Sequence, residues 1–483
     1  MRKKLLSGIF FFLLLNLLIK PFWILGVDVG VQNRVGASEY GLYFAIFSFA
    51  YMFNILLDLG VTNFNSRNIA QYNQLLQKHL PVILNAKLLL FALFLIVTFA
   101  AGAIIGYNSR QFFLLLWISI NQFLNSLILY LRSNFSALFL FKTDSLFSIM
   151  DKLLMIIFCG IMLWGGVLGG NFTIEHFIYA QTLAYGITAA TALAILVHKT
   201  GLRRLHWNWP LSVTIIKKSL PFALLALLMS FYSRLDPVML ERMLPEGTGA
   251  TQAGIYAGAF RLLDALVMLV YLVSVPLLPT YAKMIKDKQD VSQITKLVFT
   301  LVITVSAAVA ITLSFSANDV IQLFYDNNTA EISQVFKVLI FCLIPISSIY
   351  IFGTLLTANG NLKTLNIVAL ASLLTNFVAN LILIPLLMSH GSAFAALATQ
   401  VVSAVAQVVI AIRIFHLNIS AKYILQILGF LAAIVCTNIA GLYLGWQWWI
   451  TIIAVAVISV IMLFALRLAN LKSLVAMLLS KEE

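Results

Sequence analysis

Apolar runs long enough to cross a lipid bilayer follow one another along almost the whole chain. Only short polar segments separate them, and none of these could form a soluble domain. Because a bilayer core needs about 20 apolar residues per helix, the pattern predicts an all-α integral membrane protein of about fourteen transmembrane helices. The predicted ranges are 8–31, 41–62, 82–106, 111–131, 146–168, 174–197, 218–240, 254–278, 297–315, 334–356, 364–388, 392–415, 423–444 and 448–468.

The basic residues give these helices a direction. With the N-terminus in the cytoplasm, most of them fall in inner loops, and those left in outer loops are Arg34, Arg110, Arg234 and Arg242. Inner loops of membrane proteins are rich in Lys and Arg, so we expect both termini to be cytoplasmic. The longest connection, around 198–217, is basic and contains tryptophans, which predicts a segment lying at the membrane interface.

The composition agrees with a membrane protein. Hydrophobic residues make up 62% of the chain and charged residues 10%, with a mean hydropathy of +1.00, whereas a soluble domain carries about 25% charged residues. The net charge of +14 would also suit nucleic acid. The basic residues follow membrane topology instead, so no nucleic-acid partner is expected.

No pattern of catalytic or cofactor-binding residues stands out. The six histidines show no metal-ligand spacing with cysteine or carboxylate residues, and no phosphate-binding loop ending in Gly-Lys-Ser/Thr occurs. We therefore expect a protein that is not an enzyme, holds no metal or cofactor and does not hydrolyse ATP. A membrane-embedded polysaccharide polymerase or ligase is a rival class, but the large charged outer loop expected of such an enzyme is missing from this sequence.

Two short stretches of the chain resemble each other. In Glu39–Ala45 and Gln252–Gly258, Gly41 corresponds to Gly254 and Tyr43 to Tyr256. Two similar halves in a polytopic chain are typical of a transporter with its substrate site between them. The repeat predicts an N-terminal lobe at 1–205, a C-terminal lobe at 206–418, and an added helix pair with a cytoplasmic tail at 419–483.

Several segments, in order and spacing, resemble bacterial polysaccharide flippases of the O-antigen type. These flippases belong to the multidrug/oligosaccharidyl-lipid/polysaccharide exporter superfamily. The segments are Asn33–Tyr43, Asp58-Leu59-Gly60 with Asn68-Ile69-Ala70, Asp236–Met239, Gly254–Arg261, Pro276–Pro279, Asn380–Pro385 and Gly391–Thr399.

The resemblance implies a mechanism and a substrate class. Two lobes would alternate between inward-open and outward-open states and carry an undecaprenyl-pyrophosphate-linked oligosaccharide across the bacterial cytoplasmic membrane, for surface polysaccharide or O-antigen synthesis. Alternatives in the same superfamily are a lipid II-type flippase, which typically has fourteen helices, and a drug/cation antiporter. Implied partners are the lipid-linked oligosaccharide and the bilayer, with other polysaccharide-assembly membrane proteins as candidates, and the design permits a monomer.

A pyrophosphate needs cations within the membrane, where a charge costs roughly 2.5–3.5 kcal/mol on insertion scales. Lys20 is the first candidate, with Asn16 four residues earlier on the same helical face, and Pro21 predicts a bend that the resemblance links to gating. Arg261 is the second candidate, because a guanidinium binds phosphate oxygens in two places. Lysine or arginine could instead pair with an acid in the bundle, as Arg261 could with Asp264.

The remaining candidates lie on helix 2 and at the outer mouth. Ser48, Tyr51, Asn54 and Asp58 form one polar stripe along helix 2, which predicts a surface facing the cavity or a hydrogen-bonded helix seam. Near the outer mouth, Arg34 and Arg234 are substrate-binding candidates. Candidates for coupling to H⁺ or Na⁺, or for gating, are Asp28, Asp58, Asp236 and Asp264, although Asp28 and Asp236 could simply be solvated. Lys87 is expected to extend to the inner surface.

Overall fold

A computed structural model describes residues 14–466 and 468, apart from 63–64, 67–68, 70–71, 167–170, 201–208 and 418–419. This part of the chain is helical and contains no β-strand, which confirms the predicted all-α class. Eleven of its helices are long and apolar enough to cross a membrane. The predicted interfacial residues 201–208, Asn68 and Ala70 of the second motif, and the tail after 468, predicted to be cytoplasmic, lie outside the described residues.

Contacts along the chain divide it into two compact units. Unit 1 comprises Met1–Arg261 with Asn380–Ser389, and unit 2 comprises Leu262–Ala379 with His390–Glu483. The predicted lobe boundaries at 205 and 418 stay a prediction. Helices of unit 1 are η1 (Trp23–Asp28), α2 (Val29–Met52), η2 (Asn54–Leu57), η3 (Asn73–Leu75), α4 (Leu76–Ile104), α5 (Ser109–Ala137), α6 (Phe141–Trp164), α7 (Ile174–Thr200), α8 (Trp209–Met243) and α9 (Thr248–Ser274) as far as Arg261.

Unit 2 holds the rest of α9 and most of α15. Its helices are α10 (Leu277–Lys286), α11 (Ser292–Phe315), α12 (Ala317–Phe324), α13 (Thr329–Leu339), η4 (Ile340–Cys342), α14 (Leu343–Ala358), α15 (Leu362–Phe415), α16 (Ala421–Tyr443) and α17 (Trp448–Ala465).

Two continuous helical stretches each contain two predicted spans. Leu14–Met52 is interrupted at Gly36, whose φ of 85° is a backbone angle that glycine adopts without steric cost. Leu362–Phe415 is interrupted at Met388, with φ 52°. Helix α8 covers the predicted span 218–240 without being among the eleven apolar candidates. Helices therefore occur at most of the predicted positions, except that α2 ends at Met52 within the predicted span 41–62. The count of fourteen membrane spans stays a prediction.

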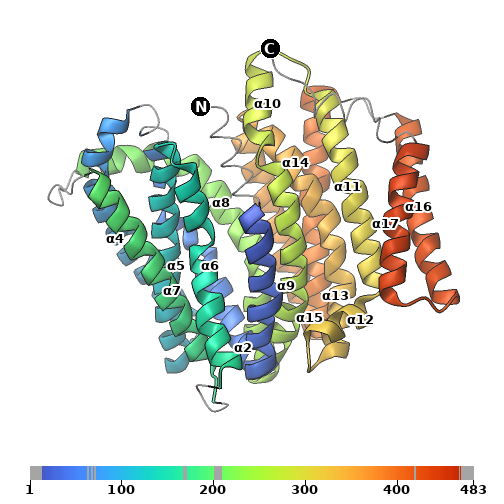
Figure 1. The fold of residues 1–483 in the computed structure, drawn as a ribbon, viewed down its shortest axis with the longest axis horizontal. Coiled ribbons are helices and arrows are strands. Elements are labelled where there is room, and N and C mark those ends of the chain that lie inside the picture. Colours follow the sequence, from blue (N-terminus) through green and yellow to red (C-terminus); the bar gives the residue numbers. More distant parts are fainter. Residues whose placement is uncertain are drawn as a thin grey trace. The chain divides into compact units, whose positions relative to one another are not determined.

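Unit 1 is built around neighbouring helices that are consecutive in the chain. Helices α4, α5, α6 and α7 stand side by side (Figure 1), and α2 packs against α5 and α8. A core of buried apolar side chains fills the space between α4, α5, α6 and α7. Its large members include Leu80, Ile83, Tyr130, Leu131, Phe135, Phe147 and Leu196.

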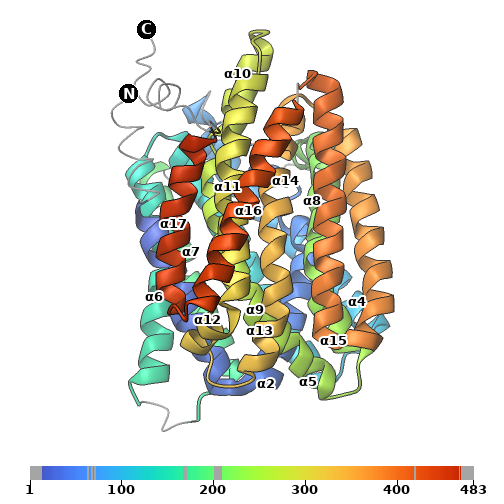
Figure 2. The same ribbon diagram turned by 90° about the vertical axis from the view of Figure 1, so that its right-hand side faces the viewer.

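Unit 2 is organised around α11. This helix packs against α14, α16 and α17, and α16 and α17 form an adjacent pair (Figure 2). Hydroxyl groups add polar contacts between these helices, including Ser306 Oγ to Ser347 Oγ at 2.7 Å and Thr300 Oγ1 to the Tyr423 hydroxyl at 2.8 Å. Such interhelical hydrogen bonds hold membrane helices together where the hydrophobic effect does not.

Helix 1 leaves regular α-helical geometry beside Pro21. Residues 14–22 are helical, and the π-helical turn η1 starts at Trp23, two residues after the proline. Proline lacks the N–H of a helical hydrogen bond, and π-turns often occur at functional sites. The distortion lies where the sequence predicts a bend, and a role of Pro21 in gating stays a prediction.

The two glycines of the sequence repeat contact each other's helices in unit 1. A Cβ built on Gly41 would lie 1.9 Å from the Ala250 carbonyl oxygen, and one built on Gly254 would lie 1.9 Å from the Ala37 carbonyl oxygen. Only glycine allows α2 and α9 to approach this closely, which is how small residues act in membrane helix pairs. The repeat is thus a packing feature joining two helices.

We predict that Gly41→Ala destabilises the protein, because the new methyl group meets backbone atoms that cannot move aside. Overpacking of this kind costs about 1–3 kcal/mol. The measurement is the thermal unfolding midpoint of the purified protein, compared with Gly186→Ala, since a Cβ on Gly186 would meet nothing within 4 Å. Equal midpoints for the two variants would contradict the close helix contact.

Candidate functional site

Asp28, Tyr40 and Arg261 form a buried ion-pair cluster in unit 1. Arg261 Nε lies 2.6 Å from Asp28 Oδ2 and donates to the Tyr40 hydroxyl at 3.0 Å. Tyr40 in turn donates to Asp28 Oδ1 at 2.8 Å, and the Arg261 guanidinium lies 5.0 Å from the centre of the Phe44 ring. Asp28 is only 2% exposed, so the alternative that it is solvated at the outer mouth is wrong.

Local backbone features bring this cluster together. Asp28 is the last residue of η1, and Tyr40 follows the break at Gly36. The close approach at Gly41 and Gly254 places α9 against α2, and Arg261 lies seven residues after Gly254, on the same helical face. Gln32 adds a hydrogen bond of 2.9 Å to the Gly254 carbonyl.

A second buried aspartate is held in a related way. Asp236 on α8 accepts hydrogen bonds from the Tyr256 hydroxyl at 2.8 Å and from Asn380 Nδ2 at 2.7 Å. It is 3% exposed, so the alternative that it is solvated is also wrong. In each half of the predicted repeat, an aspartate on the first helix accepts a hydrogen bond from a tyrosine later in the chain: Asp28 from Tyr40, and Asp236 from Tyr256. The repeat is not strict, because Tyr43, the counterpart of Tyr256, bonds to Gln181 instead.

Arg234 on α8 has a different environment from Arg261. Its guanidinium lies between two aromatic rings, 5.0 Å from the centre of Tyr51 and 5.1 Å from that of Phe260. Among the described residues it has no carboxylate partner, and its buried Nη1 has no hydrogen-bond partner. This arginine therefore has an N–H group that could donate a hydrogen bond to an anion.

Lys20 lies in unit 1 near other charged side chains, which include Lys152, Arg132 and Asp151. It is half-buried and has no ion-pair partner within the described part of the chain. Asn16, predicted on the same face, donates to Ser148 Oγ at 2.9 Å and so joins helix 1 to α6.

Sequence reasoning missed the part that α6 plays here, because Lys152 counted as an inner-loop residue. Its ammonium lies 3.1 Å from Asp151 Oδ2, donates to the Tyr185 hydroxyl at 3.1 Å and sits 5.6 Å from the Trp23 ring centre. Arg132 Nε pairs with Asp144 Oδ1 at 2.9 Å. The signal was present, since Asp144, Ser148 and Asp151 recur at steps of four and three in an apolar run.

The predicted polar stripe of helix 2 does not continue on one helical face. Helix α2 ends at Met52, a 3₁₀ turn follows over Asn54–Leu57, and Leu59 and Gly60 have φ angles of 43° and 81°. Asn54 donates to Gln122 at 3.1 Å. Asp58 turns toward α4. The Asp-Leu-Gly sequence breaks the helix because glycine readily adopts the left-handed region.

Asp58 is paired with a completely buried lysine. Lys87 Nζ lies 2.8 Å from Asp58 Oδ1 and also donates to Ser126 Oγ and the Leu57 carbonyl, at 3.0 and 3.2 Å. Lys87 is 0% exposed, so the expectation that it extends to the surface is wrong. Its stem and ammonium instead anchor the non-helical segment after η2.

Three predicted residues lie apart from these clusters or outside unit 1. Arg34 is exposed, and Asp264 is half-buried on α9 in unit 2. Pro21 precedes η1 as described above. The roles assigned to all the candidates, in binding, coupling or gating, stay predictions. No cluster of three or more His, Cys, Asp or Glu residues able to hold a metal occurs among the described residues.

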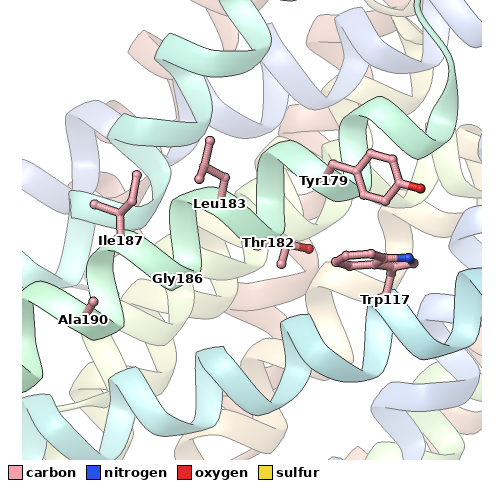
Figure 3. Close-up of a pocket in the computed structure, with 7 residues that line it drawn as sticks. All are labelled: Trp117, Tyr179, Thr182, Leu183, Gly186, Ile187 and Ala190. Atoms are coloured by element: carbon pink, nitrogen blue, oxygen red, sulfur yellow. The ribbon is translucent and has the colours of Figure 1, made fainter.

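An apolar groove of about 470 Å³ runs along α7 on unit 1. Trp117 of α5 and Tyr179 of α7 face each other at one end, with ring centres 4.9 Å apart, and Leu183, Gly186 and Ala190 line the rest (Figure 3). The lining contains no charged residue. The groove therefore suits a hydrocarbon chain and not a charged head group.

Comparison with known families decides the classification. Residues 5–285, more than half of the chain, match the family described as polysaccharide biosynthesis protein. The chain belongs to this family. The match confirms the resemblance seen in the repeat and helix-end motifs, and it spans the Asp28 cluster, Arg234 and Lys20. No curated protein sequence matched the chain.

Solved structures show the same fold. The lipid II flippase MurJ in an inward-closed conformation aligns over 91% of this chain and 95% of its own, at 13% identity and a TM-score of 0.72. A mutant of the Vibrio cholerae MATE transporter VcmN aligns over 86% and 97%, at 14% identity and 0.59. A MOP superfamily transporter from Pyrococcus furiosus aligns over 86% and 95%, at 12% identity and 0.59. The family member described here thus has the fold of MOP superfamily transporters.

The Asp58–Lys87 pair predicts unequal effects of its two single substitutions. Asp58→Asn leaves a buried lysine without its counter-charge, which costs roughly 3–5 kcal/mol. Lys87→Met should cost less, because Asp58 is 25% exposed and keeps its hydrogen bonds from Thr62. Thermal unfolding midpoints of both variants and of the double variant measure this. The double variant should be more stable than Asp58→Asn; the reverse order would contradict the pairing.

Proposed function

We propose that the protein translocates an undecaprenyl-pyrophosphate-linked oligosaccharide from the inner to the outer leaflet of the bacterial cytoplasmic membrane. The process would be alternating access, and the product would feed surface polysaccharide or O-antigen synthesis. Membership of the polysaccharide biosynthesis protein family and the fold shared with transporters support this proposal. The protein would act as a transporter, not as an enzyme, with its termini in the cytoplasm.

The observation that carries the proposal is the environment of Arg234. A guanidinium held between two rings, with a buried N–H and no carboxylate partner among the described residues, is arranged to receive an anion. A pyrophosphate carries such charge and offers several acceptor oxygens. Tyr51, which is half-buried beneath Arg234, would present its ring and hydroxyl to the adjoining sugar.

Lys20 supplies the second cation of the proposed site. It has no ion-pair partner in the described residues, whereas Lys152 and Arg132 each have an acid beside them. An arriving pyrophosphate would supply the counter-charge that Lys20 lacks, which favours binding of the anionic head group. Asn16 and Asn54 would contribute amide groups toward sugar hydroxyls, and Arg34, exposed and predicted to lie at the outer mouth, would contact the head group late, on its release.

Arg261 would act later than the sequence alone suggests. In the state described, Asp28 and Tyr40 occupy its Nε, so a phosphate must displace the Asp28 carboxylate to be bound in two places. Exchange of one anion for another costs less than exposing an unpaired arginine to hydrocarbon. The Asp28 cluster would therefore open when substrate is present and re-form after release.

Energy for transport would come from the membrane potential or from an H⁺ or Na⁺ gradient. One elementary charge moved across the membrane is worth about 2.3 kcal/mol per 100 mV. Asp28, Asp58, Asp236 and Asp264 are the candidate coupling groups, and Asp264 is the half-buried one in unit 2. The protein would need no cofactor and would work as a monomer in the bilayer, with other polysaccharide-assembly membrane proteins as candidate partners.

A lipid II-type flippase is the second candidate function. The alignment with MurJ covers 91% of this chain, against 86% for VcmN. Lipid II and the lipid-linked oligosaccharide both contain undecaprenyl pyrophosphate, so the Arg234 site does not distinguish the two candidate functions. A drug/cation antiporter is disfavoured, because Arg234 and Lys20 would repel a cation.

The test is complementation in the source bacterium after deletion of the gene. We predict that Arg234→Ala, at wild-type membrane levels, restores less than about one tenth of surface glycan, because a charge-assisted hydrogen bond to the head group is lost. Arg413→Ala, which removes an exposed arginine of unit 2, should restore it fully. Surface glycan and the leaflet position of the lipid-linked precursor are measured together.

Two results would count against the proposal in different ways. Full rescue by Arg234→Ala would contradict the role of Arg234 in substrate binding, while the assignment as a transporter would stand. Normal arrival of the precursor in the outer leaflet without this protein would contradict the flippase function itself. Arg234→Lys separates charge from geometry, and we expect partial rescue because a lysine cannot make the planar two-point contact.

A further inference from the structure

A polar cavity of about 210 Å³ lies in unit 2, and its lining includes no residue of the proposed transport site. It is formed where α11 gives way to α12 and where the short turn from α16 leads into α17. Gly441 allows α16 and α17 to approach closely beside it, since a Cβ there would lie 2.8 Å from Thr451 Oγ1. The cavity thus lies at the ends of three packed helices, α11, α16 and α17, and includes the turn that joins α16 to α17.

Two acceptor groups in its wall await a donor. Asn438 is 1% exposed, and its Nδ2 donates to the Ile434 carbonyl at 2.8 Å and to Thr312 Oγ1 at 3.3 Å. Its buried Oδ1 has no hydrogen-bond partner among the described residues. Asp319, on the first turn of α12, is exposed and makes no ion pair in the described part of the chain, so the buried unsatisfied acceptor is that of Asn438 alone. A buried unsatisfied acceptor is unfavourable, so a ligand rich in hydroxyl groups would be stabilised here.

The rest of the lining selects the class of ligand. It includes Trp446, Trp448 and Gln447 but no lysine or arginine, so a phosphate or carboxylate would meet only the charge of Asp319. Indole rings offer flat apolar faces with a polar N–H, which suits the C–H face of a pyranose. Pockets for drug-sized ligands measure about 300–1,000 Å³. A cavity of about 210 Å³ therefore fits one sugar ring.

The cavity lies at the outer end of its helices. Lys283 and Lys286 precede α11, and Lys422 lies at the start of α16, so the basic residues gather at the opposite ends. By the positive-inside rule, the cavity then opens toward the outer surface.

We infer that this cavity binds a single uncharged monosaccharide ring on the outer side of the membrane. Asp319 and Asn438 accept hydrogen bonds from adjacent hydroxyls, and a tryptophan stacks on the ring. The ring could come from a free sugar or from one unit of a glycan chain. The site is separate from the transport site, so this inference does not depend on the proposed function.

The test uses the full protein in nanodiscs, which avoids detergents with sugar head groups. Neutral hexoses, N-acetylhexosamines and deoxyhexoses are each offered free and as methyl glycosides, and binding is read by saturation-transfer difference NMR and calorimetry. We expect saturable millimolar binding of at least one sugar. Binding of its methyl glycoside as well points to a glycan unit, and binding of the free form alone points to a free sugar.

Paired variants locate the binding. Asp319→Asn and Trp448→Leu should weaken it about tenfold or more through the lost hydrogen bond and stacking. Glu331→Gln removes an exposed acid of α13, and Trp449→Leu removes the neighbouring indole, which does not line the cavity; both should bind as wild type. Absence of sugar binding up to about 100 mM, equal losses in test and control variants, or saturable binding of ethanolamine or Na⁺ in place of sugars would overturn the inference. The limit of about 100 mM corresponds to the weak end of the affinity scale.

Discussion

The ion pair between Arg261 and Asp28 is the interaction on which the interior of unit 1 depends. A charge in the hydrocarbon core is unfavourable unless it is paired and hydrogen-bonded. Here the Tyr40 hydroxyl forms a hydrogen bond with each of the two ions. The pair ties helix 1, α2 and α9 together at one point. The π-turn, the break at Gly36 and the glycine contact between α2 and α9 all serve to bring these three side chains within reach.

The other cations of unit 1 fall into two groups, those paired with an acid and those without such a partner. Lys87 is fixed by Asp58 and a ring of acceptors, and Arg132 and Lys152 each have an acid beside them. Arg234 and Lys20 lack such partners in the described chain. Paired charges hold the helices, and the two unpaired cations are the ones that the proposed function assigns to an anionic head group.

Much of the fold could be predicted from the sequence, because a bilayer permits few structures. Apolar run length placed most of the helices, Pro21 marked a bend, and Gly36 lies between two predicted spans, whereas the break beside Gly60 was not predicted. The pairing of charges could not be predicted in the same way. Helical spacing relates residues on one helix, whereas Asp28 meets Arg261 across more than two hundred residues of chain, and Lys87 reaches Asp58 only because helix 2 is interrupted. Distances between helices decide such contacts, and the single sequence does not contain them.

The most direct measurement is flipping by the purified protein in sealed liposomes. Lipid-linked oligosaccharide from the source bacterium is placed in one leaflet, and a membrane-impermeant lectin or glycosidase reports its arrival in the other. An imposed membrane potential supplies the driving force. We predict transfer with the wild-type protein and loss of transfer with Arg234→Ala, whose guanidinium would otherwise hold the pyrophosphate. Transfer no faster than in protein-free liposomes, under both polarities of the potential and in H⁺ and Na⁺ gradients, would contradict the proposed function.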